Sequence, residues 1–437
     1  MNKGMALATT LAILPAMLAA QESAPQLPVT APPRADTTQL NAVRISLDEA
    51  IRLALQHNHA LQAQRTMILQ NQAQETTANL RPNPVISWDS QFFPLFNPEE
   101  FSASYLENQA QFDFGIGYLF ERGKKRQHRL QAAKDATAVT RSQVADDERQ
   151  LVFNVSQQFV AALLAKSTFD FAQQNLDSFR QTVDISQQRY KSGDMSEGDL
   201  LKIKLQMFQF QSDLETARLA KSQALVALRQ QVGYESVPDT FDVDGDLDYQ
   251  PIKGNVEDLQ ALALRSRPDL QAAQLGVVAA RSQLALAQAN GKRDLNASFS
   301  YTHTAGISSG AFFFNIDLPI FDRNQGEIAR TRYAITQSQE QQLETSQQVF
   351  TDVKNAYESL RMNEKIIQLY QGGYVDEAKQ SKDIDEYSYK RGVASLLDYL
   401  DAERTFRTSQ LAYRQALAGY MTALEQMREA VGTRTLP

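Results

Sequence analysis

Four short segments of the chain alternate strictly between apolar and polar residues. They are residues 85–93, 110–120, 295–304 and 312–320. Alternation with a period of two places the two sets of side chains on opposite faces of a β-strand. One face is aromatic and aliphatic. The other face is polar and supplies the candidate lumen-facing residues, which are Asp89, Gln91, Asp113, Asn315 and Asp317.

These segments have the length of tilted transmembrane strands, which need about 9–11 residues. An apolar outer face with a polar inner face is typical of a membrane barrel with a wet lumen. A half-buried sheet of a soluble α+β domain uses the same alternation and stays as the alternative. Four strands cannot close a barrel, and open edges are not tolerated in lipid. If the strands span a membrane, two or three copies of the chain must pool them.

The strands are followed by helices that are too long for a globular domain. Residues 123–190 contain no proline, and glycine occurs only at the start of this stretch. A helix of about 65 residues runs on the order of 100 Å. Apolar residues recur every seven positions, as in a coiled-coil seam. These residues are Val155, Ala162, Phe169, Leu176, Val183 and Tyr190. A generic fibrous coiled coil is the alternative, but the interposed strands weigh against it.

Two similar turns, near 191–199 and 390–398, connect each long helix to a returning helix. Gly193 and Gly392 stand where the end of a helix favours a left-handed residue. Ser196 and Ser395 are predicted N-caps, each with an aspartate three residues later, as in a capping box.

The whole pattern occurs twice, which indicates a duplicated unit. Leu61-Gln62-Ala63 returns as Leu270-Gln271-Ala272, and the turn that contains Gly193 returns at Gly392. The first repeat covers residues 44–233 and the second 256–437, with 234–255 as a connector. Each repeat reads helix, strand, strand, very long helix, turn and long helix.

Composition narrows the class of protein. The 437 residues carry a net charge of −7 and a mean hydropathy of −0.41, and basic residues are dispersed among acids. A nucleic-acid partner would favour a basic face. The absence of cysteine excludes disulfides, thiolate metal sites and a lipid anchor on cysteine. Residues 1–20 have the organisation of a signal peptide, and 21–43 read as a disordered lead-in.

Nothing in the sequence indicates an enzyme or a cofactor. Gly306, Ser308 and Gly310 fit the G-x-S-x-G pattern of a nucleophile elbow. That motif needs a strand followed by a helix. Because a strand is predicted to follow here, we interpret the segment as a hairpin loop.

The sequence resembles the TolC family of outer-membrane efflux proteins over nearly its whole mature length. The resemblance rests on "RPDLQAA", "LPIFDRNQGEIA" and the paired Gly-x-x-Ser-x-x-Asp-x-Leu turns. "FDRNQG" is similar to the CzcC-like branch, which serves heavy-metal resistance-nodulation-division pumps. The resemblance implies a homotrimer with a twelve-stranded barrel in the outer membrane. It also implies a periplasmic α-helical tunnel and an equatorial belt that includes residues 234–255.

The resemblance also implies a gate at the periplasmic end. Asp398 and Asp401 match the family's aspartate ring, Tyr389 its gate tyrosine and Asp199 the partner on the first hairpin. The gate arginine of the family falls at Ala394, so its locking salt bridge would be absent. Solvated acids at a helix start are the alternative for these aspartates. The hairpin tips, at Gly193, Ser196, Gly392 and Ser395, would dock a periplasmic adaptor.

By this resemblance the protein is a passive exit duct fed by an inner-membrane pump through the adaptor. "FDRNQG" favours divalent metal cations as cargo. Drugs or amphiphiles, type I protein secretion, and a non-channel coiled-coil protein of the envelope are the alternatives. Many relatives in the CzcC-like branch are lipoproteins, and this chain differs from them because it has no cysteine.

Overall fold

The computed structural model describes residues 43–252 and 254–436. The predicted signal peptide at 1–20 lies outside the described residues, as does the lead-in predicted for 21–43 except its last residue. None of the described helices combines the length and the apolar character that crossing a membrane requires.

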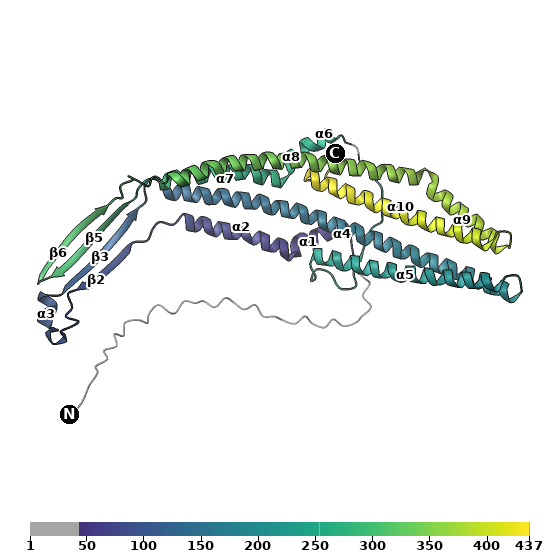
Figure 1. Ribbon diagram of the computed structural model, residues 1–437, viewed down its shortest axis with the longest axis horizontal. Helices are drawn as coiled ribbons and strands as arrows, with labels where there is room; N and C mark the ends of the chain where they lie inside the picture. The colour runs from purple at the N-terminus through teal and green to yellow at the C-terminus, as the bar shows by residue number, and fades with distance from the viewer. Residues whose placement is uncertain (1–42, 253, 437) are drawn as a thin grey trace, which may run out of the picture. The chain divides into compact units, whose positions relative to one another are not determined.

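Each repeat contributes a pair of shorter helices, two strands and a long helical hairpin (Figure 1). The first repeat comprises β1 (Arg44–Ile45), α1 (Leu47–His57), α2 (His59–Ala78), β2 (Val85–Gln91), the 3-10 turn η1 (Pro98–Glu100), α3 (Ala103–Asn108), β3 (Gln111–Phe120), α4 (Lys125–Lys191) and α5 (Glu197–Val232). After β4 (Asp242–Val243), the second repeat comprises α6 (Val256–Ser266), α7 (Pro268–Asn290), β5 (Leu295–Thr304), β6 (Ile307–Asn315), α8 (Gln325–Leu369), the π-helical turn η2 (Tyr370–Tyr374), α9 (Val375–Lys390) and α10 (Leu396–Val431).

The four long strands form one antiparallel sheet in the order β2-β3-β5-β6. The register places Ile86, Ile116, Phe299 and Phe312 in one row across the sheet. Because directly opposed residues share a face, this row forms part of a continuous apolar face. That face is largely exposed in the single chain, with Phe312 at 73%.

The last strand does not lie where the alternation predicted it. The prediction of a strand at 312–320 is wrong, because β6 runs from Ile307 to Asn315. Ala305 and Gly306 have φ values of 51° and 70° and make a two-residue hairpin turn. This turn sets the register, so the strand begins directly after it, and Asp317 lies beyond its end.

The first strand is also shorter than predicted, since β2 ends at Gln91 rather than at residue 93. Phe92 has a φ of 60°, and Pro94 lies two residues later. These two residues take the chain out of the extended conformation.

The long helix of the first repeat is continuous, but that of the second repeat is broken. α4 has 67 residues and packs against α2, α5, α7 and α10. In the second repeat, η2 separates α8 from α9, and Gly373 within it has a φ of 120°. We predicted an unbroken helix in both repeats, and the glycine pair at 372–373 explains the difference.

Two short parallel strands, β1 and β4, join the start of the described chain to the connector. Three apolar clusters form the core. One lies around Val155, one around Met427 and one between the two hairpins around Phe179. The four strands lie at one end of the 43–436 body and both hairpin tips at the other (Figure 1).

Candidate functional site

The two hairpin tips have nearly the same backbone geometry. Gly193 and Gly392 have φ values of 84° and 77°, the left-handed region that a Cβ disfavours. Ser196 and Ser395 accept hydrogen bonds from the backbone N–H groups of Asp199 and Asp398, at 3.1 and 3.2 Å. The second tip closes a full capping box, because the Asp398 carboxylate also accepts from the backbone N–H of Ser395.

Tyr389 is buried at the second tip and contacts the first hairpin. Its hydroxyl lies 3.2 Å from Ser186 Oγ, and Arg189 donates to its carbonyl at 2.9 Å. Its ring stacks on Tyr399 with centroids 5.3 Å apart and 8° between the planes. Phe179 continues the stack on the other face of Tyr399. These contacts hold the second hairpin against the first.

Asp199 and Tyr389 are not brought together within one chain. The Asp199 carboxylate accepts from Ser196 at 2.8 Å and from Lys202 at 3.2 Å, and these contacts lower its pKa. Ala394, the position at which the resemblance implies an arginine, lies in the turn. The arginine that reaches Tyr389 instead comes from the first hairpin, at position 189.

Asp398 and Asp401 line one surface hollow of about 610 Å³ between α9 and α10, and Asp385 joins them from α9. Both α10 carboxylates have local partners, Ser395 for Asp398 and Arg404 for Asp401 at 2.6 Å. The sequence interpretation missed Asp385. Asp385 lies four residues before Tyr389, and this spacing makes the two residues neighbours on the surface of α9.

A second charged cluster lies between α9 and α10 and was not predicted. Lys382 and Lys390 both bond to Glu386, at 2.6 and 2.5 Å. Glu403 of α10 is nearby and only 6% exposed. The four-residue spacing of Lys382, Glu386 and Lys390 was the available signal, since it places them on one helix face.

The predicted lumen-facing residues share one face of the sheet, apart from Asp317. Asp89 lies directly opposite Asp113, and Gln91 opposite Gln111. Asn315 ends β6 on that same face, opposite Asn296. Like charges directly opposed across strands destabilise a sheet unless solvent or donors separate them. Gln91 and Gln111 provide such donors, each 2.7 Å from an aspartate oxygen, Gln91 to Asp89 and Gln111 to Asp113.

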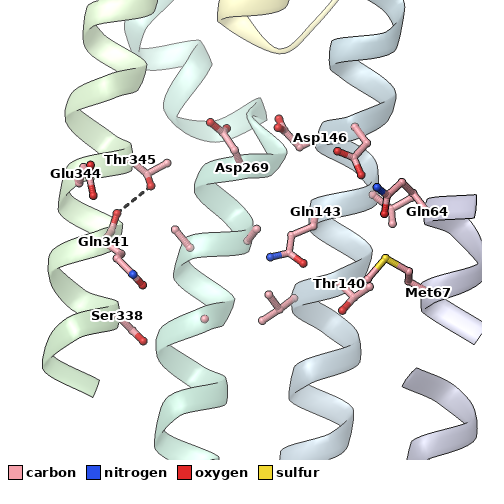
Figure 2. A pocket seen from close by; sticks show the side chains of 16 residues that line it. Gln64, Met67, Thr140, Gln143, Asp146, Asp269, Ser338, Gln341, Glu344 and Thr345 are labelled. Carbon is pink, nitrogen blue, oxygen red and sulfur yellow. Dashed lines mark hydrogen bonds between the residues drawn. The ribbon is translucent and has the colours of Figure 1, made fainter. Parts of the chain in front are cut away.

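A polar pocket of about 680 Å³ lies between α2, α4, α7 and α8 (Figure 2). Asp146, Asp269 and Glu344 border it, together with amide and hydroxyl side chains such as Gln143 and Thr345. Over residues 43–252 and 254–436, no three histidine, cysteine or acidic side chains lie close enough to hold a metal ion. The pocket is a polar space between the helices.

Two strand pairs with an exposed apolar face, continued by two long hairpins that end in matching turns, define a protein of the membrane-channel class. The chain belongs to the outer membrane efflux protein family, whose model matches residues 50–234 and 259–433. The family expected from the sequence is confirmed, as are the fold class and the outer-membrane location.

Similar proteins agree with this assignment. The chain is 24% identical to the cobalt-zinc-cadmium resistance protein CzcC of Cupriavidus metallidurans, over 84% of this chain and 85% of that protein. A membrane protein from Pseudomonas aeruginosa has a TM-score of 0.73 and 20% identity, covering 93% of this chain and 99% of that one. The solved structure of CusC has a TM-score of 0.72 at 18% identity, over 94% and 99% of the two chains.

Proposed function

We propose that three copies of this chain close a twelve-stranded barrel, continued by an α-helical tunnel, and that this duct passively conducts cargo out of the cell. The observation that carries the proposal is the sheet itself. In the part of the chain that the structure describes, β2 and β6 each pair on one side only. Lipid does not tolerate open strand edges, and barrels need at least about 8 strands. Further copies of the chain meet both requirements.

The helices support the same assembly. α5 exposes an apolar stripe at Leu201, Leu205, Phe208, Leu219 and Val226, on the side away from α4. An exposed stripe of this size favours an interface. α8 and α9 expose Met362, Leu369, Ile384 and Tyr387 at the other edge of the chain. Contact between the two unlike edges would give a closed ring.

Divalent metal cations are the cargo class that the relatives and the acidic tip favour. The similar protein CzcC is named for resistance to cobalt, zinc and cadmium. The tip hollow also contains Asp385, Asp398 and Asp401. Three-fold symmetry would multiply these carboxylates around a narrow mouth, and acidic rings favour cations. By the family resemblance, an inner-membrane pump and a periplasmic adaptor at the hairpin tips deliver the cargo.

Current through planar bilayers tests whether the protein is a channel. We expect the purified oligomer to conduct ions and to have about three times the mass of one 49.0 kDa chain. An oligomer that never conducts would instead indicate a structural coiled-coil protein of the envelope.

Susceptibility of a deletion strain tests the cargo. We expect hypersensitivity to zinc, cobalt and cadmium and an unchanged response to dyes and bile salts. Sensitivity to amphiphiles alone would indicate a drug duct, and loss of a secreted protein would indicate type I secretion.

The double variant Asp398→Asn with Asp401→Asn tests the gate. Asparagine keeps an acceptor for the Ser395 cap, so the change removes charge rather than the turn. We expect higher conductance and weaker block by multivalent cations. Glu99→Gln removes an exposed acid of η1, away from both hairpin tips, and serves as the control. Bilayer currents equal to those of the unmodified protein would contradict a gate at these residues.

A further inference from the structure

Glu403 is a buried residue for whose carboxyl group the described residues supply no hydrogen-bonded partner. It lies on α10 beneath α9 and is 6% exposed. In the described part of the chain neither basic neighbour donates to it, since Lys382 bonds to Glu386 at 2.6 Å and Arg407 to Asp213 at 3.1 Å. Carboxylates are seldom buried without such a partner. The group is therefore held by packing rather than by a salt bridge of its own.

The surroundings of Glu403 contain charges of both signs. α9 contributes Lys382, Asp383 and Glu386, and α10 contributes Arg407 one turn away. Tyr399 on α10 also lies within electrostatic reach of Glu403.

α4 and α5 contact Tyr399 and Arg407, which are the neighbours of Glu403 on α10. On α4, Thr182 lies 3.4 Å from the Tyr399 hydroxyl and Phe179 stacks on the Tyr399 ring. α5 supplies Asp213, which occupies Arg407. Arg407 also keeps one buried guanidinium nitrogen without a partner among the described residues.

This environment favours the neutral form of Glu403. Burial raises the pKa of Glu403, and repulsion from Glu386 and Asp383 adds to that effect. Lys382 and Arg407 oppose it only in part. The packed arrangement of α9 on α10 therefore binds a proton at Glu403 more readily than an arrangement in which water reaches the carboxyl.

The chain has a break between α8 and α9 at which α9 could change its angle to α10. Gly373 interrupts the helix directly before α9, and π-helical turns of this kind often mark functional positions. Tyr370, at the start of η2, packs against Tyr413 of α10, and the centroids of the two rings are 5.9 Å apart. Beyond the break, Ala378 and Tyr389 are the buried residues that hold α9 in place.

We propose that Glu403 is a proton-controlled latch, in which protonation of its carboxyl tightens the packing of α9 on α10 and so narrows the periplasmic end. The sign follows from linkage, because lowering the pH favours the state that binds more protons. Acidification therefore closes the second hairpin, and neutral pH loosens it. The packing of α9 on α10 does not depend on the proposed function. Only the effect of the latch on conductance rests on the proposed function.

Amide hydrogen exchange in the full-length purified oligomer tests the latch. Peptides from 375–390 are compared between the unmodified protein and Glu403→Gln at the same pH, which cancels the intrinsic pH dependence of exchange. Near neutral pH we expect exchange in the variant to be slower, because the neutral amide removes the cost of burying a charge at this position. Near pH 5 the difference should shrink. Glu99→Gln, an exposed acid on η1, should match the unmodified protein.

Equal exchange in Glu403→Gln and the unmodified protein, or faster exchange in the variant, would overturn the proposal. Lys382→Met adds a second test, because loss of the attractive charge should move the midpoint of the pH response upward. A purely structural role for Lys382 would change exchange without moving that midpoint. If exchange follows these expectations but no variant conducts ions, the latch stands and the exit-duct function fails.

Discussion

The two helical hairpins have the same ends but different middles. Both turn at a left-handed glycine and restart at a serine cap. The helix before the first turn, α4, has 67 residues and contains no glycine. Its counterpart before the second turn is divided at η2 into α8 and α9. The two copies therefore share the tip geometry, and only the second contains a break. The difference assigns a supporting role to the first hairpin and an adjustable one to the second.

The junctions between the short and long helices make a parallel comparison. In the first repeat, the Asn58 amide donates to the carbonyl of Gln231 at 2.9 Å. At the equivalent position in the second repeat, Arg267 donates to the carbonyl of Ala430 at 3.3 Å. Arg267 also bonds to Asp269 and Asp352, at 2.6 and 2.8 Å. One junction is thus neutral, and the other is an ion-pair network at the same place.

The largest expected difference between the repeats lies at these junctions. Arg267→Ala should lower the free energy of unfolding by about 3–5 kcal/mol, because it leaves two carboxylates without their partner. Asn58→Ala should lower it by about 1–3 kcal/mol, because it leaves one carbonyl unpaired and removes the N-cap acceptor of α2. Guanidinium unfolding in detergent, followed by circular dichroism, measures both. Equal losses would mean that the network adds nothing to the second junction.

The same network predicts a pH dependence. Burial alone would raise the pKa of Asp269, but its bond to Arg267 and nearby charges lower it overall. A carboxylate with a lowered folded-state pKa stabilises the protein above its ordinary value, 3.8, and that contribution is lost as the pH falls through the folded-state pKa. The melting temperature should therefore decrease when the pH is lowered below about 4. Asp269→Asn should flatten this part of the profile, and an unchanged profile would contradict the assignment.

The glycine pair at the break offers an internally controlled test. Gly373→Ala should cost about 1–3 kcal/mol, because a residue with a Cβ is strained at a φ of 120°. Gly372 does not have a positive φ, and a Cβ there meets no atom within 4 Å. Gly372→Ala should therefore stabilise the helix by up to about 1 kcal/mol. Melting temperatures of the two variants should move in opposite directions, and a shift in the same direction would argue against a strained Gly373.

The smallest expected effect concerns the caps. Ser196→Ala and Ser395→Ala should each cost about 1 kcal/mol, since each removes a side-chain acceptor from the first turn of a helix. Exchange rates of the amides at 197–200 and 396–399 would measure the loss at each tip. A markedly greater loss at Ser395 would show that its complete capping box matters.

Much of this fold could be predicted because its signals are local and repeated. The turn glycines, the serine caps and the uninterrupted stretch after Gly123 each specify structure within a few residues. The position of β6 was mispredicted because the hydrophobic alternation continues from Phe312 past the end of the strand. The register depends instead on the left-handed pair Ala305 and Gly306, which sequence alternation does not reveal.

The candidate site was less predictable than the fold. The contact of Arg189 with Tyr389 joins residues 200 positions apart, and no periodicity reports it. Among the described residues, Glu403 has no bonded partner because Lys382 bonds to Glu386 and Arg407 bonds to Asp213. Such choices of partner follow from packing between hairpins. In contrast, the break at η2 had a visible signal in Gly372 and Gly373.

The continuity of α4 has a mechanical consequence. At 1.5 Å per residue, its 67 residues form a strut of about 100 Å between the strands and the first tip. A load applied at the first tip would reach the strand end of the molecule with little loss. A load at the second tip would meet η2, where the non-helical Gly373 interrupts the regular helix. The molecule can thus yield at one end while the sheet that it supports keeps its shape.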